Sequence, residues 1–104
     1  MKTYNKLVRD NIPQIIERSG KRCQTRVLND DEYLAQLDAK LREEFAEYAQ
    51  SGEVEELADL VEVALALAAA KGVPEAKFAE MRAEKASRNG AFAQKIFLEW
   101  VDGD

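Results

Sequence analysis

The sequence predicts a mainly α fold, a helical bundle of about four helices arranged around an antiparallel helix hairpin. Three observations support this prediction. Apolar side chains recur at helical spacing in the middle of the chain, prolines and glycines number only two and five in 104 residues, and charged residues make up 34% of the chain. A chain of this length is long enough for one modest core and too short for two. We therefore expect residues 1–104 to form a single all-α domain.

The first predicted helix is short. Asp10 is a suitable cap for a helix over residues 11–19, Pro13 lies in its first turn, and Gly20 ends it. The following residues 22–28 show little periodicity, so we expect a loop or a short strand there.

The helix hairpin occupies the middle of the chain. Residues 29–32 supply a capping side chain and three acids, which favour the start of a helix that ends near Gly52. The apolar residues of this helix recur at helical spacing and are Leu34, Leu37, Leu41, Phe45 and Tyr48. A third helix is expected from Val54 to Ala70, with Gly72 after it. Because only about three residues join the two helices, we expect them to pack antiparallel.

The last predicted helix begins at Val73 and Pro74 and breaks at Asn89 and Gly90. The apolar tail that follows suits either a packed extended arm or a strand. If it is a strand, we expect residues 95–100 to pair with residues 24–28 as a short β pair.

Charge and composition exclude several classes of function. A net charge of −5 argues against binding to nucleic acid or to an anionic membrane, because both need an excess of Lys and Arg. With no histidine and only Cys23, the chain offers no zinc set, no internal disulfide and no Ser-His or Cys-His nucleophile. No apolar signal-peptide core follows the first residues. We therefore expect a cytoplasmic protein.

Two pairs of acids do not fit an ordinary helix hairpin. Glu44 and Glu47 are three residues apart beside the apolar stripe of the second helix, so the two side chains can converge on one cation. Glu56 and Asp59 repeat this spacing on the third helix. The fourteen residues from 57 to 70 are all apolar except Asp59 and Glu62. Acids in such surroundings are expected to be neutralised, paired or bound to a metal.

Four carboxylates without histidine form an oxygen-only set, which suits Mg²⁺ or Mn²⁺. A bound Mg²⁺ keeps several waters and also binds substrate phosphates, so an acidic protein can recruit a phosphorylated ligand through the metal. The alternative is that these acids form only the solvated face of the hairpin. An E-x-x-E spacing taken alone favours that alternative, and two such pairs on facing helices make a metal site equally well supported.

The residues that carry these pairs resemble a known signature. Residues 40–47 and 56–60 resemble the E-x-x-E and E-x-x-D motifs of the MazG-like superfamily of all-α nucleotide pyrophosphohydrolases. Residues 6–13 resemble the N-terminus of its phosphoribosyl-ATP pyrophosphohydrolase-like branch. Less specific matches to that branch are Lys85, Arg88, Gly90 and Phe92.

The resemblance implies a helical protein that forms dimers or larger assemblies and hydrolyses the α–β phosphoanhydride of a nucleotide to a monophosphate and pyrophosphate. It implies Glu44, Glu47, Glu56 and Asp59 as the Mg²⁺ ligands. Metal-activated water would attack the α-phosphorus, with Glu44 as the candidate catalytic base. The candidate substrate-binding residues for the phosphates are Lys85, Arg88, Lys6 and Arg9.

Structural explanations remain for the cations. Each can be a solvated surface charge, Arg9 can pair with Asp10 to seat the first helix, and Lys40 can form a surface ion pair with Glu44.

Two other functions stay open. One is phosphoribosyl-ATP hydrolysis in histidine synthesis. The other is a non-catalytic helical oligomerisation or interaction module, in which the acids only keep the chain in solution. The third helix is apolar nearly all round, which a four-helix monomer of this size cannot easily cover, so we expect a homodimer or a higher homo-oligomer.

Overall fold

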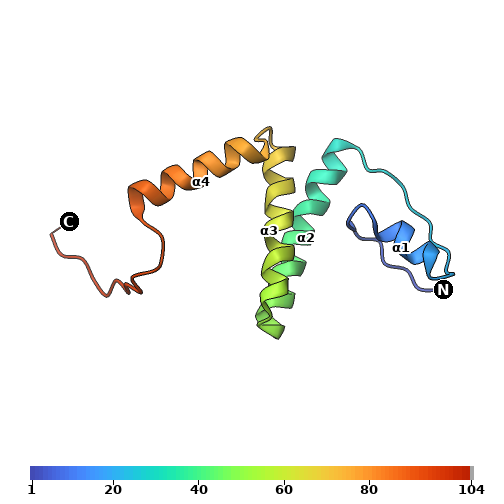
Figure 1. Ribbon diagram of the computed structural model, residues 1–104, viewed down its shortest axis with the longest axis horizontal. Coiled ribbons are helices and arrows are strands. Elements are labelled where there is room, and N and C mark those ends of the chain that lie inside the picture. The colour runs from blue at the N-terminus through green and yellow to red at the C-terminus, as the bar shows by residue number, and fades with distance from the viewer. Residues whose placement is uncertain (104) are drawn as a thin grey trace.

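The computed structural model describes residues 1–103 and confirms a mainly α fold with four helices. In chain order the helices are α1 (Ile12–Arg18), α2 (Asp30–Ser51), α3 (Val54–Ala70) and α4 (Glu75–Asn89). The predicted bounds of α3 are confirmed at both ends, and those of the other helices to within two residues. Figure 1 shows α2 and α3 side by side as the central hairpin, with α1 and α4 on opposite sides of it.

Local interactions define both ends of α2. The side chain of Asn29 accepts a hydrogen bond from the backbone N–H of Glu32, and the Glu32 side chain accepts one from the backbone N–H of Asn29. This reciprocal capping box satisfies two backbone donors that the helix itself leaves free. At the other end Gly52 adopts a left-handed conformation with φ of 68°, which costs glycine little, and its N–H donates to the carbonyl of Tyr48. The chain therefore reverses into α3 without a longer loop.

The core is small and lies between α2 and α3. Its buried residues are Leu37, Val63 and Leu67, and Leu37 is only 3% exposed. Four half-buried residues pack against them: Leu7, Leu34, Leu41 and Ala66. Because Leu7 belongs to the N-terminal segment, the core ties that segment to the hairpin across 30 residues or more of sequence.

Three expectations about the ends of the chain are wrong. The N-cap of α1 is Asn11 rather than Asp10, and within residues 1–103 its side chain makes no capping hydrogen bond. The predicted β pair of residues 24–28 and 95–100 does not form, and residues 1–103 contain no strand. Figure 1 gives the reason, since these segments lie at opposite ends of the molecule. The tail is not packed against its own chain either, because its large apolar side chains are exposed.

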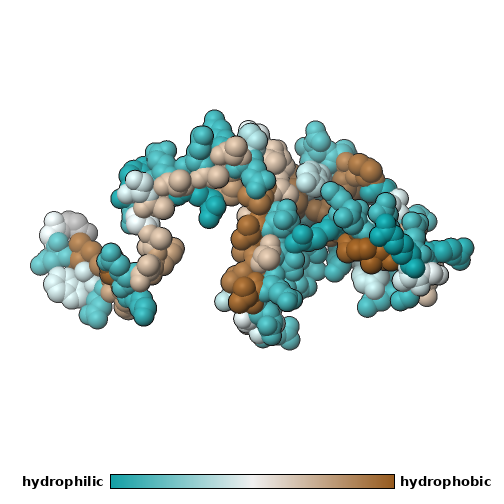
Figure 2. Space-filling model, viewed as in Figure 1, coloured by the Kyte–Doolittle hydropathy of each residue, from teal (hydrophilic) through white to brown (hydrophobic). Residues whose placement is uncertain are grey.

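The chain is far more open than a compact monomer. Its radius of gyration is 18.4 Å, whereas a compact domain of this length has about 13 Å. Its accessible surface is 9590 Å², against about 5,900 Å² for a folded monomer of this mass. Figure 2 shows apolar surface along the hairpin on the side facing α4 and the tail. Within residues 1–103, no helix is long and apolar enough to cross a membrane.

Candidate metal centre

Carboxylates from both helices of the hairpin converge on one region. Glu44, Glu56 and Asp59 each bring a carboxylate oxygen to within 4.8 Å of the other two. Glu47 belongs to a second group of the same dimensions, with Glu43 and Glu44. Three of the four predicted ligands therefore meet in one group, whereas Glu47 is grouped with Glu44 but not with Glu56 or Asp59. We call the combined set the acidic cluster, and its members are Glu43, Glu44, Glu47, Glu56 and Asp59.

Glu44 is the buried member of the acidic cluster. The residue is only 5% exposed, and its Oε1 lies 3.3 Å from Nζ of Lys40 one helical turn earlier. Its other oxygen, Oε2, is buried and has no hydrogen-bond partner in the part of the chain that the structure describes. Burial raises the pKa of Glu44, and the neighbouring Glu47 adds to the rise, although Lys40 acts in the opposite direction. A buried carboxylate oxygen of this kind is stabilised by a proton, a hydrogen-bond donor or a cation.

Glu43 is the one member of the acidic cluster that was not predicted as a metal ligand. Its two carboxylate oxygens lie 3.0 Å from Nζ of Lys6 and 3.3 Å from Nζ of Lys40. Burial alone would raise the pKa of Glu43, but the hydrogen bonds from both lysines outweigh it and leave the pKa lowered. The contact between Lys40 and Glu43 could have been predicted from their i, i+3 spacing on a helix. The contact with Lys6 spans 37 residues and had no local signal.

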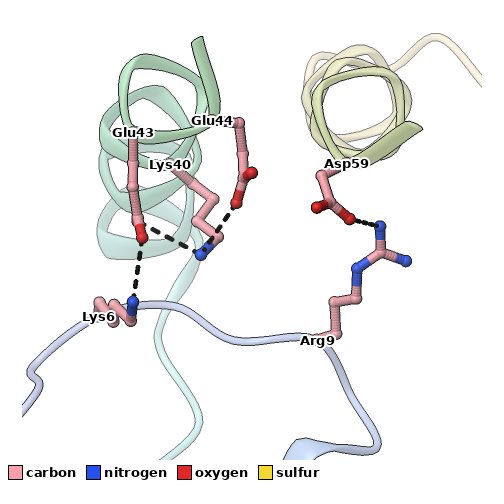
Figure 3. A network of polar contacts seen from close by, with 6 residues as sticks. All are labelled: Lys6, Arg9, Lys40, Glu43, Glu44 and Asp59. Atoms are coloured by element: carbon pink, nitrogen blue, oxygen red, sulfur yellow. Dashed lines mark hydrogen bonds and ion pairs between the residues drawn. The ribbon is translucent and has the colours of Figure 1, made fainter. Parts of the chain in front are cut away.

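The N-terminal segment places two cations on the acidic cluster. Leu7 packs on the core, and the residues on either side of it reach the two helices (Figure 3). Lys6 contacts Glu43 on α2, while Nη2 of Arg9 donates a 2.7 Å hydrogen bond to Oδ1 of Asp59 on α3. The Glu43 carboxylate holds the pKa of Lys6 above its usual value. The predicted alternative, an Arg9 pair with Asp10, is not among the ion pairs of residues 1–103.

The acidic cluster carries more carboxylates than cations. Three cations contact the acidic cluster, namely Lys6, Arg9 and Lys40. The five carboxylates outnumber the three cations, and one of these cations, Arg9, also lies 4.0 Å from Glu62, so the cluster has an excess of acids. All potential ligand atoms are oxygens, as the hard cations Mg²⁺ and Mn²⁺ prefer.

Two predicted substrate-binding residues lie away from this cluster. Lys85 and Arg88 are exposed side chains in the last turns of α4. Glu56 and Asp59 lie in the first two turns of α3, whereas α4 starts beyond the opposite end of that helix and runs away from it (Figure 1). Neither cation forms an ion pair within residues 1–103. The structure thus brings Lys6 and Arg9 to the acidic cluster but not Lys85 and Arg88.

Comparison with known proteins adds a partial similarity. An uncharacterized protein of Mycolicibacterium smegmatis is 61% identical to this chain over 41 residues, or 39% of this chain. The matched stretch spans 42% of that protein, so the chain covers less than half of its length. No family model matches the chain. No solved structure matches it.

Proposed function

We propose that this protein is a Mg²⁺-dependent nucleotide pyrophosphohydrolase that cleaves the α–β phosphoanhydride of a nucleoside triphosphate or a related nucleotide. The observation that carries the proposal is Oε2 of Glu44, a buried and unpartnered carboxylate oxygen within a cluster of oxygen ligands. The resemblance of residues 40–47 and 56–60 to the MazG-like signature supports the same conclusion. The lone exposed Cys23 suits the reducing cytoplasm, where we propose that the protein acts.

Glu44, Glu47, Glu56 and Asp59 would hold the metal. Bound there, Mg²⁺ supplies charge neutralisation of the phosphate oxygens and a lowered pKa for coordinated water. Glu44 is the candidate proton acceptor, because its free oxygen faces the other carboxylates from a buried position. Lys40 orients Glu44 through the 3.3 Å contact with Oε1 and leaves Oε2 available.

Arg9 and Lys6 are the proposed phosphate-binding residues of this chain. Arg9 is 54% exposed, so its guanidinium can turn from Asp59 to a phosphate without leaving solvent. A guanidinium binds phosphate oxygens in a bidentate manner, and a lysine acts as a point charge. With Asp59 as a metal ligand, Arg9 would be free to bind a phosphate in place of that carboxylate. For Lys85 and Arg88, a role in phosphate binding requires α4 of a second copy of the chain.

The exposed apolar surface favours one further candidate. A helical interaction module would use the hairpin and the tail to bind another protein, and the acidic cluster would then bind no metal. Stoichiometric partner binding without any dependence on Mg²⁺ distinguishes this function from the enzymatic one.

The test is hydrolysis of a nucleotide panel. Purified protein is incubated with Mg²⁺ or Mn²⁺ and with nucleoside triphosphates, modified nucleotides and phosphoribosyl-ATP, and release of monophosphate and pyrophosphate is measured. We expect release that requires the metal and falls on the order of 10³-fold in Glu44→Gln and in Asp59→Asn. The matched control is Glu55→Gln, which replaces an exposed acid on α3, the helix of Asp59, and should retain activity. A preference for phosphoribosyl-ATP would assign the enzyme to histidine synthesis. If the folded protein released no product from any nucleotide of the panel, the enzymatic function would be rejected.

A further inference from the structure

Two apolar surfaces of this chain are exposed to solvent in the structure. The first is the C-terminal arm, residues 92–101, whose six large apolar side chains are between 67% and 95% exposed. They are Phe92, Ile96, Phe97, Leu98, Trp100 and Val101. Scattered exposed apolar residues are normal, but six large ones within ten residues are a concentration that points to a binding segment.

The second surface is a shallow depression on the hairpin of about 390 Å³. It is lined by Leu41, Arg42 and Phe45 of α2 and by Leu60 of α3, and Phe45 is 62% exposed. The lining contains no member of the acidic cluster, so the depression is a separate surface of the hairpin.

The arm and the depression do not meet within one chain. The arm begins beyond the far end of α4, and Figures 1 and 2 show open space between it and the hairpin. The accessible surface exceeds that of a compact monomer of this mass by about 3,700 Å². A stable interface needs about 800 Å² from each partner. The excess is therefore ample for a dimer.

Charge specifies how the two surfaces match. Arg42 is the only charged residue that lines the described depression, and it has no ion-pair partner within residues 1–103. Glu99 lies between Leu98 and Trp100 on the arm and is likewise unpaired in the described part of the chain. The arm thus carries one acid, Glu99, among its large apolar side chains and one base, Lys95, near its start, and Glu99 is opposite in charge to the single base of the depression.

We propose that the C-terminal arm of a second copy of this chain occupies the depression on α2 and α3, with Glu99 beside Arg42. In a two-fold dimer each copy gives its arm and receives its partner's, so every such contact is made twice. The two arms then cover the exposed apolar depression of both hairpins. This inference goes beyond the proposed function and does not rest on it, because it follows from the apolar surfaces and the charges alone.

The experiment is a reciprocal charge reversal in the full chain, measured by analytical ultracentrifugation. We expect a wild-type dimer, and about tenfold or greater weakening of dimerisation in Arg42→Glu and in Glu99→Arg, because each variant places like charges together at both contacts. An equimolar mixture of the two variants restores opposite charges at both contacts, so it should dimerise as the wild type does. Matched controls are Glu17→Arg and Arg18→Glu on the exposed α1, which should leave dimerisation unchanged.

Fluorescence of Trp100, the single tryptophan of the chain, gives an independent readout. We expect its emission to move to shorter wavelength as the wild-type dimer forms and to remain that of an exposed indole in each single variant. Restoration in the Arg42→Glu, Glu99→Arg double variant but not in the mixture would overturn the proposal in favour of the arm folding onto its own chain. A monomeric wild type, or dimerisation insensitive to both reversals, would also overturn it.

Discussion

The α2–α3 hairpin and the C-terminal part of the chain, residues 75–103, differ in how far their own contacts stabilise them. The hairpin has a capping box at its start, a left-handed glycine at its turn and the whole buried core. Residues 75–103 contain no buried residue, and their helix α4 has no side-chain cap. Both regions are rich in apolar residues, so composition alone does not account for the difference.

The difference between the two regions is that the hairpin is stabilised by contacts between residues close in the sequence. Capping and i, i+4 packing need only neighbouring residues, so the hairpin acquires its shape within about forty residues of sequence. The arm has apolar side chains but no neighbouring surface of its own chain to cover them. The acidic cluster lies in the region whose geometry is fixed locally, as a site of defined geometry requires.

The largest effect on stability should come from the hairpin core. Leu37→Ala removes a side chain that is 3% exposed, and should lower the free energy of unfolding by about 2–3 kcal/mol. Phe97→Ala on the exposed arm should cost almost nothing at protein concentrations below the dimer dissociation constant. Urea unfolding at high and low protein concentration measures both. Equal losses of unfolding free energy in the two variants at low protein concentration would contradict the claim that the hairpin is stabilised by its own contacts and the arm is not.

A smaller effect concerns the N-terminal segment that the core holds in place. Arg9→Gln removes a cation from Asp59, so Mg²⁺ binding to the free protein should become several-fold tighter. The KM for the nucleotide should rise about tenfold, because a charge-assisted hydrogen bond to phosphate is lost. Calorimetric metal titration and steady-state kinetics measure the two changes, with exposed Arg18→Gln as the control. If Arg9→Gln instead weakened Mg²⁺ binding, as Asp59→Asn is expected to do, Arg9 would act only by positioning Asp59.

The cap of α2 tests whether the hairpin is stabilised locally. Asn29→Ala breaks the capping box and should lower the free energy of unfolding by about 1 kcal/mol. Asn11→Ala is the matched control, since Asn11 is the N-cap of α1 but makes no side-chain capping bond within residues 1–103. Thermal unfolding of both variants gives the comparison. A loss as large in Asn11→Ala as in Asn29→Ala would show that the helix termini are stabilised by other contacts.

The smallest effect is a pH dependence at the same cap. Hydrogen bonds from the Arg26 guanidinium and from the N–H of Asn29 lower the pKa of Glu32 below its ordinary value. A lowered folded-state pKa adds stability that is complete above the unfolded-state pKa, about 4.3, and disappears as the pH falls through the folded-state pKa. Arg26→Gln should therefore be less stable than the wild type at pH 7 and equal to it in strong acid. Unfolding midpoints measured from pH 7 to pH 2 test this, and a difference that persists at pH 2 would contradict it.

The fold was predictable wherever the signal was local. The helix bounds followed from Asn29, Gly52 and the apolar spacing, and the hairpin followed from the short connection. The convergence of the acids was predictable because two pairs at i, i+3 spacing lie on helices that must face each other.

What the sequence did not predict depends on distant contacts. The Lys6–Glu43 and Arg9–Asp59 pairs each span 37 residues or more, and no spacing rule reports them. The β pair was predicted from β-favouring composition, but strand pairing needs two segments to meet, and these lie at opposite ends of the molecule. Asp10 was a chemically suitable cap, yet the chain enters α1 one residue later.

The most direct test of the metal centre is calorimetric titration of Mn²⁺ and Mg²⁺ into the metal-free protein, without nucleotide. We predict saturable binding to the wild type and to Glu55→Gln, and loss of that binding in Glu44→Gln and Asp59→Asn that remain folded by circular dichroism. Equal, weak binding to all four proteins would contradict a metal site at the acidic cluster.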